Sequence, residues 1–226
     1  MSVTAQSIID RVRLQIMDAG GTRWTDAELL KWVSDGQRAL VAYSPGISST
    51  TASSTLVAGT KQTIPSDGHM LFTVVRNLTS GGSPGRATRI VSRELLDGQD
   101  PNWHTSTASP MVQNYVFDPQ EPRKFYVYPP NDGTGYVELV YSVLPADLTA
   151  LSDTLVVMPI YQTALFDYVM FRAHQKDSDF AAGQTIAAAY LQLFMAYVTE
   201  GEAGTLTNNP NLQLMPPNPS VKGSAK

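Results

Sequence analysis

Two long apolar segments near the C-terminal end constrain the fold of this chain more than any other feature. The first predicts a helix over 159–176, beginning with Pro159, whose missing amide proton costs nothing in a first helical turn. The second predicts a helix over 178–199, because large apolar residues recur there at spacings of three and four: Ile186, Tyr190, Leu193, Phe194 and Tyr197. Since only Asp177-Ser178-Asp179 separates the two, we expect the helices to be antiparallel neighbours.

The second segment has no charged residue from 180 to 198, which raises the question of a membrane span. Three observations argue against one: it contains Gln184, Thr185 and Gln192, its large side chains fall on one stripe, and no basic cluster flanks it. Small residues surround Ala187, so another backbone can approach closely. We therefore expect no membrane contact, and a helix that is buried in a packed assembly.

The N-terminal residues predict two further helices. Over 4–18 the apolar residues lie on one face, and Gly20-Gly21 is expected to end that helix. The next helix begins with a capping box, in which the Thr25 hydroxyl accepts from the Glu28 amide and the Glu28 carboxylate returns to the Thr25 amide. Trp24 stands at the position of a hydrophobic staple. We interpret it as an anchor for the start of the helix, with a subunit interface as the alternative.

Between 48 and 143 the apolar pattern changes to the alternation typical of strands. Residues 48–54 are a run of serine and threonine that we expect to be a flexible loop, and 79–85 are expected to form a loop tip. The candidate strands are 55–58, 61–64, 71–78, 87–91, 112–117, 124–128 and 136–143. The last two strands, with the turn between them, predict an antiparallel hairpin.

These elements predict an α+β fold with segregated helices and strands. Helices from both ends of the chain are expected to form one antiparallel helical bundle over 1–47 and 145–200, with an inserted antiparallel β domain over 48–144. The last stretch, 201–226, is rich in proline, glycine and asparagine and cannot bury enough apolar surface to fold alone. We expect either disorder or an extended C-terminal arm that binds a partner through Leu212, Leu214, Met215 and Pro216.

The composition favours a subunit of an assembly. Charged residues make up 16% of the chain, below the usual value of about a quarter, which indicates that other subunits cover much of the surface. The formal net charge of −4 gives no support to sequence-independent nucleic-acid binding. The absence of cysteine excludes disulfides, thiolate metal sites and cysteine nucleophiles.

The motifs predict no catalytic residue, no metal ligand and no cofactor. Residues 81–85 match the serine-hydrolase elbow in letters, but Pro84 has no amide proton to bind an oxyanion and no helix pattern follows. The three histidines, His69, His104 and His174, lack the spacing of metal-binding pairs. A catalytic pair of carboxylates stays open, because such a pairing is spatial. The aromatic residues of 125–141 are expected to face a core or a neighbouring strand rather than a sugar.

Four stretches, in this order, resemble the head-to-tail adaptor (connector) proteins of short-tailed bacteriophages, the group that includes the tail tubular A-like proteins of the lower collar. They are RWTDAELLKWVSDGQRALV at 23–41, PRKFYVYPP at 122–130, VELVYSVLP at 137–145 and YVMFRAHQKDSDFAAGQTIAAAYLQLFMAY at 168–197. The resemblance implies a structural virion protein without enzymatic activity. It also implies a homo-oligomeric ring, commonly of twelve copies, between the portal protein and the tail nozzle or another tail protein. Phage DNA would pass through the ring during ejection without sequence-specific binding.

The resemblance further implies that the helical domain forms the ring, that the C-terminal arm reaches the portal, and that the protein assembles in the host cytoplasm and resides in the neck of the virion. The candidates for a subunit interface or for helix packing are Trp24, Arg38, Arg172, Ala187 and Tyr190. We expect the two arginines to form salt bridges between helices or between subunits. Two alternatives stay open: another tail-tube or fibre subunit, and a hydrolase of cell-wall or capsule sugars.

Overall fold

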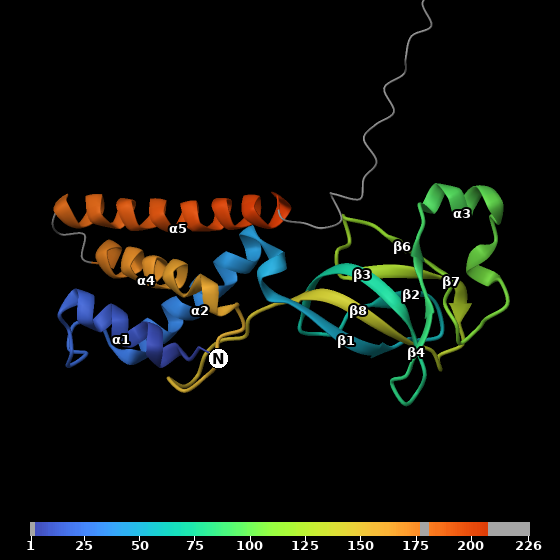
Figure 1. The fold of residues 1–226 in the computed structure, drawn as a ribbon, viewed down its shortest axis with the longest axis horizontal. Coiled ribbons are helices and arrows are strands. Elements are labelled where there is room, and N and C mark those ends of the chain that lie inside the picture. The colour runs from blue at the N-terminus through green and yellow to red at the C-terminus, as the bar shows by residue number, and fades with distance from the viewer. Residues whose placement is uncertain (1–2, 177–180, 208–226) are drawn as a thin grey trace, which may run out of the picture.

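The computed structural model describes residues 3–176 and 181–207. Four long helices gather at one end of an elongated molecule, and the strands, with the short helix α3 (Arg93–Gln99), lie at the other, so the predicted α+β class is confirmed (Figure 1). The helices are α1 (Ala5–Ile16), α2 (Asp26–Tyr43), α3 (Arg93–Gln99), α4 (Gln162–Lys176) and α5 (Ala181–Thr207), with three short 3₁₀ helices, η1 (Pro45–Ser48), η2 (Trp103–Thr105) and η3 (Pro159–Tyr161).

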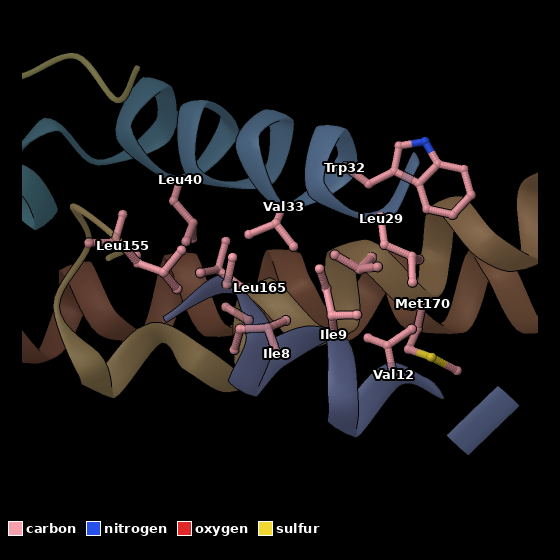
Figure 2. Close-up of a cluster of buried hydrophobic side chains, with 14 of the residues drawn as sticks. Ile8, Ile9, Val12, Leu29, Trp32, Val33, Leu40, Leu155, Leu165 and Met170 are labelled. Carbon is pink, nitrogen blue, oxygen red and sulfur yellow. The ribbon is translucent and has the colours of Figure 1, made fainter. Parts of the chain in front are cut away.

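The four long helices share one hydrophobic core (Figure 2). Each contributes side chains that are 0 or 1% exposed, among them Ile8 of α1, Leu29 of α2, Leu165 of α4 and Phe194 of α5. Burial of one such side chain stabilises the fold by roughly 1.5–3 kcal/mol. Gly36 lets α2 approach α4 closely, since a Cβ atom there would lie 2.9 Å from the ring of Tyr168.

The end of α1 differs from the prediction. The helix ends at Ile16, and the left-handed residue that follows is Met17, with a φ of 56°, rather than Gly20-Gly21. Gly21 also has a positive φ, of 63°, but it lies within the connection to α2. The helix ends early because Asp18, the residue after Met17, is fixed by hydrogen bonds to that connection.

The end of α5 differs as well. The helix continues to Thr207, beyond Glu200, so the first residues of the predicted arm are helical. The glycines at 201 and 204 do not prevent this, because each costs a helix interior only about 1 kcal/mol relative to alanine. Among the described residues, no helix combines the length and the apolar character that crossing a membrane requires.

The β domain consists of two four-stranded sheets, ordered β1-β8-β3-β4 and β2-β7-β6-β5. All neighbouring strands are antiparallel except β5 and β6. The strands are β1 (Ser49–Thr55), β2 (Gly59–Thr63), β3 (Gly68–Leu78), β4 (Pro84–Ala87), β5 (Arg89–Ile90), β6 (Asn114–Phe117), β7 (Lys124–Asn131) and β8 (Tyr136–Val143). Side chains from both sheets form a second core that includes Leu71, Val74, Phe125, Val127 and Leu139.

The serine and threonine run over 48–54 is not a loop. Each residue from Ser49 to Thr55 pairs with β8 in an unbroken register. Composition alone was misleading, because threonine is β-branched and fits a strand, and because Ala52 packs against the core of the β domain. The predicted strand at 55–58 is also wrong, since β1 ends at Thr55 and the chain then turns into β2.

The predicted hairpin of the last two strands is also wrong, since β7 and β8 lie in different sheets. Asn131, 1% exposed, directs the crossing between the sheets. Its side-chain oxygen accepts hydrogen bonds from the amides of Gly133 at 2.8 Å and Gly135 at 3.2 Å, and its nitrogen donates to the Ser109 carbonyl at 3.1 Å. The turn therefore leads into the opposite sheet rather than back along β7.

Strand β4, strand β5 and helix α3 also differ from the prediction. The predicted strand at 87–91 divides at Thr88, which separates β4 in one sheet from β5 in the other. Helix α3 was not predicted; it begins after Ser92, whose hydroxyl accepts from the Leu95 amide at 3.3 Å. Residues 79–83 form the turn between β3 and β4, as expected of a loop tip, whereas Pro84 and Gly85 of the predicted loop already belong to β4.

Candidate functional site

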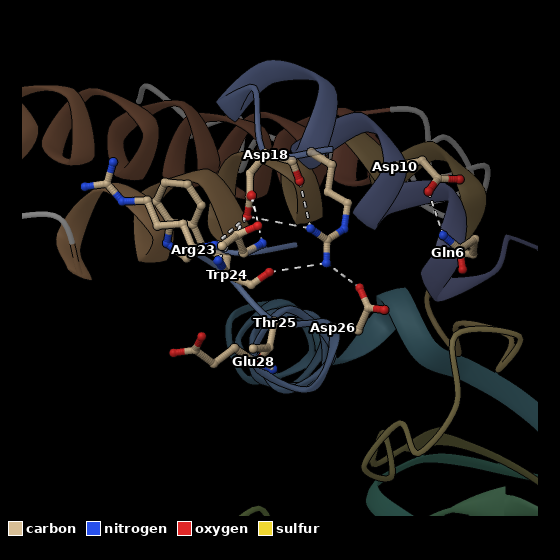
Figure 3. A network of polar contacts seen from close by, with 10 residues as sticks. Gln6, Asp10, Asp18, Arg23, Trp24, Thr25, Asp26 and Glu28 are labelled. Atoms are coloured by element: carbon tan, nitrogen blue, oxygen red, sulfur yellow. Dashed lines mark hydrogen bonds and ion pairs between the residues drawn. The ribbon is translucent and has the colours of Figure 1, made fainter. Parts of the chain in front are cut away.

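Trp24 lies in a network that fixes the connection between α1 and α2 (Figure 3). The Asp18 carboxylate accepts hydrogen bonds from the amides of Thr22 at 2.9 Å, Arg23 at 3.2 Å and Trp24 at 3.0 Å. The bond from the Trp24 amide is the largest influence that holds the pKa of Asp18 below its ordinary value. Arg13 completes the network by donating to the Trp24 carbonyl at 3.2 Å and by pairing with Asp26. The Trp24 side chain is 5% exposed, which supports its role as an anchor of the helix start.

The predicted capping box is present in part. The Thr25 hydroxyl accepts from the Glu28 amide at 3.3 Å, as expected. The Glu28 carboxylate, however, turns to Lys176 of α4, whose Nζ lies at 2.6 Å. This hydrogen bond is the main reason why the pKa of Glu28 is lowered, with only a smaller contribution from the Thr25 amide. The acid therefore connects α2 to the end of α4 more than it caps its own helix.

Both arginine candidates have partners within the chain. Arg38 of α2 pairs with Asp35 at 3.4 Å and with Asp147, which lies on the segment leading to α4. Arg172 lies beside Tyr168: burial raises the pKa of Tyr168, and the charge and hydrogen bond of Arg172 oppose that rise. These contacts lie within α2, within α4, or between α2 and the segment before α4, so none of them is a salt bridge between two helices.

Helix α5 is held on the molecule by a narrow row of residues. Over 183–199, where its side chains are described, the buried residues are Gly183, Ala187, Phe194 and Val198. Tyr190 adds a partly buried contact, its ring stacked on His174 at 5.7 Å and edge-on to Phe166 at 6.4 Å. Ala187 and Tyr190 therefore serve the packing of α5 on α4.

Over 183–199, most of the remaining circumference of α5 is exposed. We call this surface the outer face of α5; its large apolar side chains, 36 to 50% exposed, are Ile186, Leu191, Leu193 and Tyr197. No residue from 181 to 199 carries a formal charge. A surface helix of a monomeric protein normally presents charged residues to water, so the uncharged outer face of α5 is a candidate interaction surface.

A groove of about 410 Å³ runs between α4 and α5. Its lining combines aromatic, aliphatic and amide side chains without any formal charge: Phe171, Gln175, Gln184, Ala187, Ala188 and Leu191. No sequence pattern predicts the groove, because it depends on how the two helices pack. With the outer face of α5 it forms the candidate interaction surface.

One buried carboxylate stands apart from these contacts. Asp167 of α4 is 5% exposed, and burial raises its pKa to about 6, while the charge of Arg11 on α1 opposes the rise. Over 3–176 and 181–207, no group of three or more His, Asp or Glu side chains is arranged to hold a metal ion. Ser83, from the hydrolase-like motif, lies in the turn before β4, so the strand–turn–helix context of that motif is missing.

His104 and several aromatic residues of the β domain have structural contacts. His104 accepts or donates a hydrogen bond with Thr60 at 2.9 Å and stacks on Trp103 with the ring centroids 3.7 Å apart. Phe125 and Tyr141 are buried in the core, and Tyr126 packs edge-on against Trp103. The predicted partner-binding residues Leu212, Leu214, Met215 and Pro216 lie outside the described residues.

The sequence profile of the SU10 adaptor protein family matches residues 3–213. The chain belongs to this family. The family consists of phage head–tail adaptors, which are structural components of the virion and form no known enzyme class, and the adaptor role implies contacts with other phage head or tail proteins. A comparison with curated proteins gave no match. In this adaptor the match spans the helical domain and the β domain together, so the whole fold belongs to the family unit.

Proposed function

We propose that this SU10-family adaptor forms a closed ring, commonly of twelve copies, between the portal and the tail nozzle of a short-tailed phage. The observation that carries the proposal is the family match over nearly the whole chain. The uncharged outer face of α5 supports it, because a cyclic ring gives every subunit two covered flanks. A permanent contact of this kind buries on the order of 2,000 Å² or more.

In this proposal the helical domain forms the ring as an antiparallel bundle, and the β domain meets the nozzle or the next tail protein. The residues after α5, including Leu212, Leu214, Met215 and Pro216, reach the portal. The net charge of −4 fits a conduit, since a strongly basic lining would hold DNA phosphates and slow its passage. The subunit is made and assembled in the host cytoplasm, acts without a cofactor, and performs no reaction.

Removal of 208–226 tests the portal contact without cutting α5. The full chain and the truncated chain are mixed with purified portal rings and examined by sedimentation. We expect the full chain to bind and the truncated chain to bind much more weakly, with the same circular dichroism spectrum in both. Unchanged binding would remove these residues from the portal contact.

Electron microscopy of the same mixtures tests the ring itself. A single ring layer on the portal supports the adaptor role. A protein that stacks into a tube or forms fibres would instead be a tail-tube or fibre subunit, and release of sugar fragments from host envelopes would point to a hydrolase.

A further inference from the structure

The most exposed large apolar side chain of the described residues is in an unusual backbone conformation. Met17, directly after α1, is 93% exposed, and Leu14 one turn before it is 82% exposed. Among the described residues, Met17 is the one non-glycine residue with a positive φ, of 56°. The left-handed conformation disfavours any residue with a Cβ atom, so glycine would suit the isolated subunit better at this position. A protruding apolar side chain at such a position calls for a partner.

The groove between α4 and α5 offers a surface of matching character. It is uncharged, holds about 410 Å³, and is lined by the ring of Phe171 and by Ala187, Ala188 and Leu191 together with two amide side chains. This volume is large enough for the ends of two aliphatic side chains. Apolar side chains that enter an uncharged groove leave no buried charge unpaired.

The protrusion and the groove lie on opposite flanks of the helical domain. On α4, Phe166 faces α1, since Arg11 stacks over its ring at 5.0 Å. Tyr168 faces α2, where Gly36 leaves room for it, and Phe171 of the groove contacts Tyr168 with a centroid distance of 6.0 Å. The groove therefore opens on the α2 side of α4, whereas Met17 follows α1 on the other side.

The two features also lie at the same height along the molecule. Phe171 and Gln175 of the groove belong to the last turns of α4, and Met17 directly follows the last turn of α1. Figure 1 places the ends of α1 and α4 together at the end of the molecule away from the β domain. A cyclic ring requires two different, complementary patches on opposite flanks at one level along its axis. This arrangement meets that requirement.

We infer that Leu14 and Met17 of one copy insert into the α4–α5 groove of the next copy. The inference rests on the proposed ring and names one pair of surfaces that closes it. The occupant of the groove is thus a second copy of this chain, and the contact is one part of a larger interface that includes the outer face of α5.

The first test is Met17→Gly. In the isolated subunit this change relieves the left-handed backbone, so the urea midpoint is expected to stay the same or rise. The protein concentration at which rings form is expected to rise about 10- to 100-fold, because the interface loses the burial of one apolar side chain. The control is Met111→Ala, which removes a 47% exposed methionine from the β domain and should assemble like the unaltered chain. Assembly is followed by mass photometry, alone and with portal rings.

The second test uses the absence of native cysteine. Chains with Met17→Cys and chains with Ala188→Cys are prepared separately, mixed under ring-forming conditions, and treated with a short thiol-specific cross-linker. We expect covalent dimers in the mixture and none with either chain alone. Ala188→Trp, which fills the groove, should weaken assembly to the same extent as Met17→Gly.

The outcomes separate this inference from the proposed function. If rings form, but Met17→Gly assembles normally and no cross-link appears, the contact is wrong and the ring stands. If Ala188→Trp weakens assembly and Met17→Gly does not, another occupant fills the groove and the inference is wrong. If the unaltered chain forms no ring, alone or on the portal, the proposed function itself fails.

Discussion

Asp167 gives the structure a pH dependence of known sign. The carboxylate is 5% exposed on α4, and its pKa is raised from 3.8 to about 6. A folded-state pKa above the unfolded value means that the folded chain binds the proton more tightly, so the contribution of Asp167 to stability is fully present below about pH 4 and is lost as the pH rises through about 6. This difference between the folded and unfolded pKa of Asp167 corresponds to a loss of about 3 kcal/mol of unfolding free energy over that pH range.

Asp167→Asn removes this titration. Relative to the unaltered chain, the variant should gain about 3 kcal/mol of unfolding free energy between pH 4 and pH 7.5, whatever cost the buried amide adds at both pH values. The assay is urea unfolding of dilute subunit across this range. Asp10→Asn, an exposed aspartate on α1, controls for the loss of one acid. A free-energy difference between Asp167→Asn and the unaltered chain that does not change with pH would refute the reasoning.

Three further substitutions test the packing and polar contacts. Phe194→Ala should cost about 3–5 kcal/mol in urea unfolding, since this 1% exposed ring fixes α5 to the core. Gly36→Ala should cost about 1–3 kcal/mol, because the new Cβ atom would lie 2.9 Å from the Tyr168 ring; a stabilised variant would show that the ring moves aside. Lys176→Ala should lower the free energy of unfolding by less than about 1 kcal/mol, because its pair with Glu28 is exposed to solvent. A larger loss would mean that this pair is shielded from solvent.

The sequence predicted the helices well because their signals are local. The helical signals depend on residues that are close in the sequence: apolar residues at spacings of three and four, Pro159 in a first turn, and the Thr25 hydroxyl at a helix start. Helices α2 and α4 therefore lie close to where they were expected. The ends of α1 and α5 were predicted less accurately. The left-handed conformation of Met17 depends on contacts of the following residues with the rest of the chain. The continuation of α5 through two glycines depends on the helix that precedes them. Neither can be predicted from the few residues at the helix end alone.

The β domain was harder to predict because strand pairing is not local. The serine and threonine run forms strand β1 because it pairs with β8, which lies about 90 residues later in the sequence. The turn at Asn131 joins two sheets because the Asn131 side chain donates a hydrogen bond to the carbonyl of Ser109, which is distant in the sequence. The same limit applies to the candidate surface. Trp24 and Arg38 could be singled out from the sequence as candidates, whereas the groove and the exposed Met17 emerge only once the helices are placed.

A cryo-electron microscopy reconstruction of the neck of a phage particle that carries this chain tests the central claim most directly. The account predicts one ring of this fold between head and tail, with α5 covered by the neighbouring copy. Particles in which the protein is absent, or stacks along a tail tube with the outer face of α5 open to solvent, would contradict it.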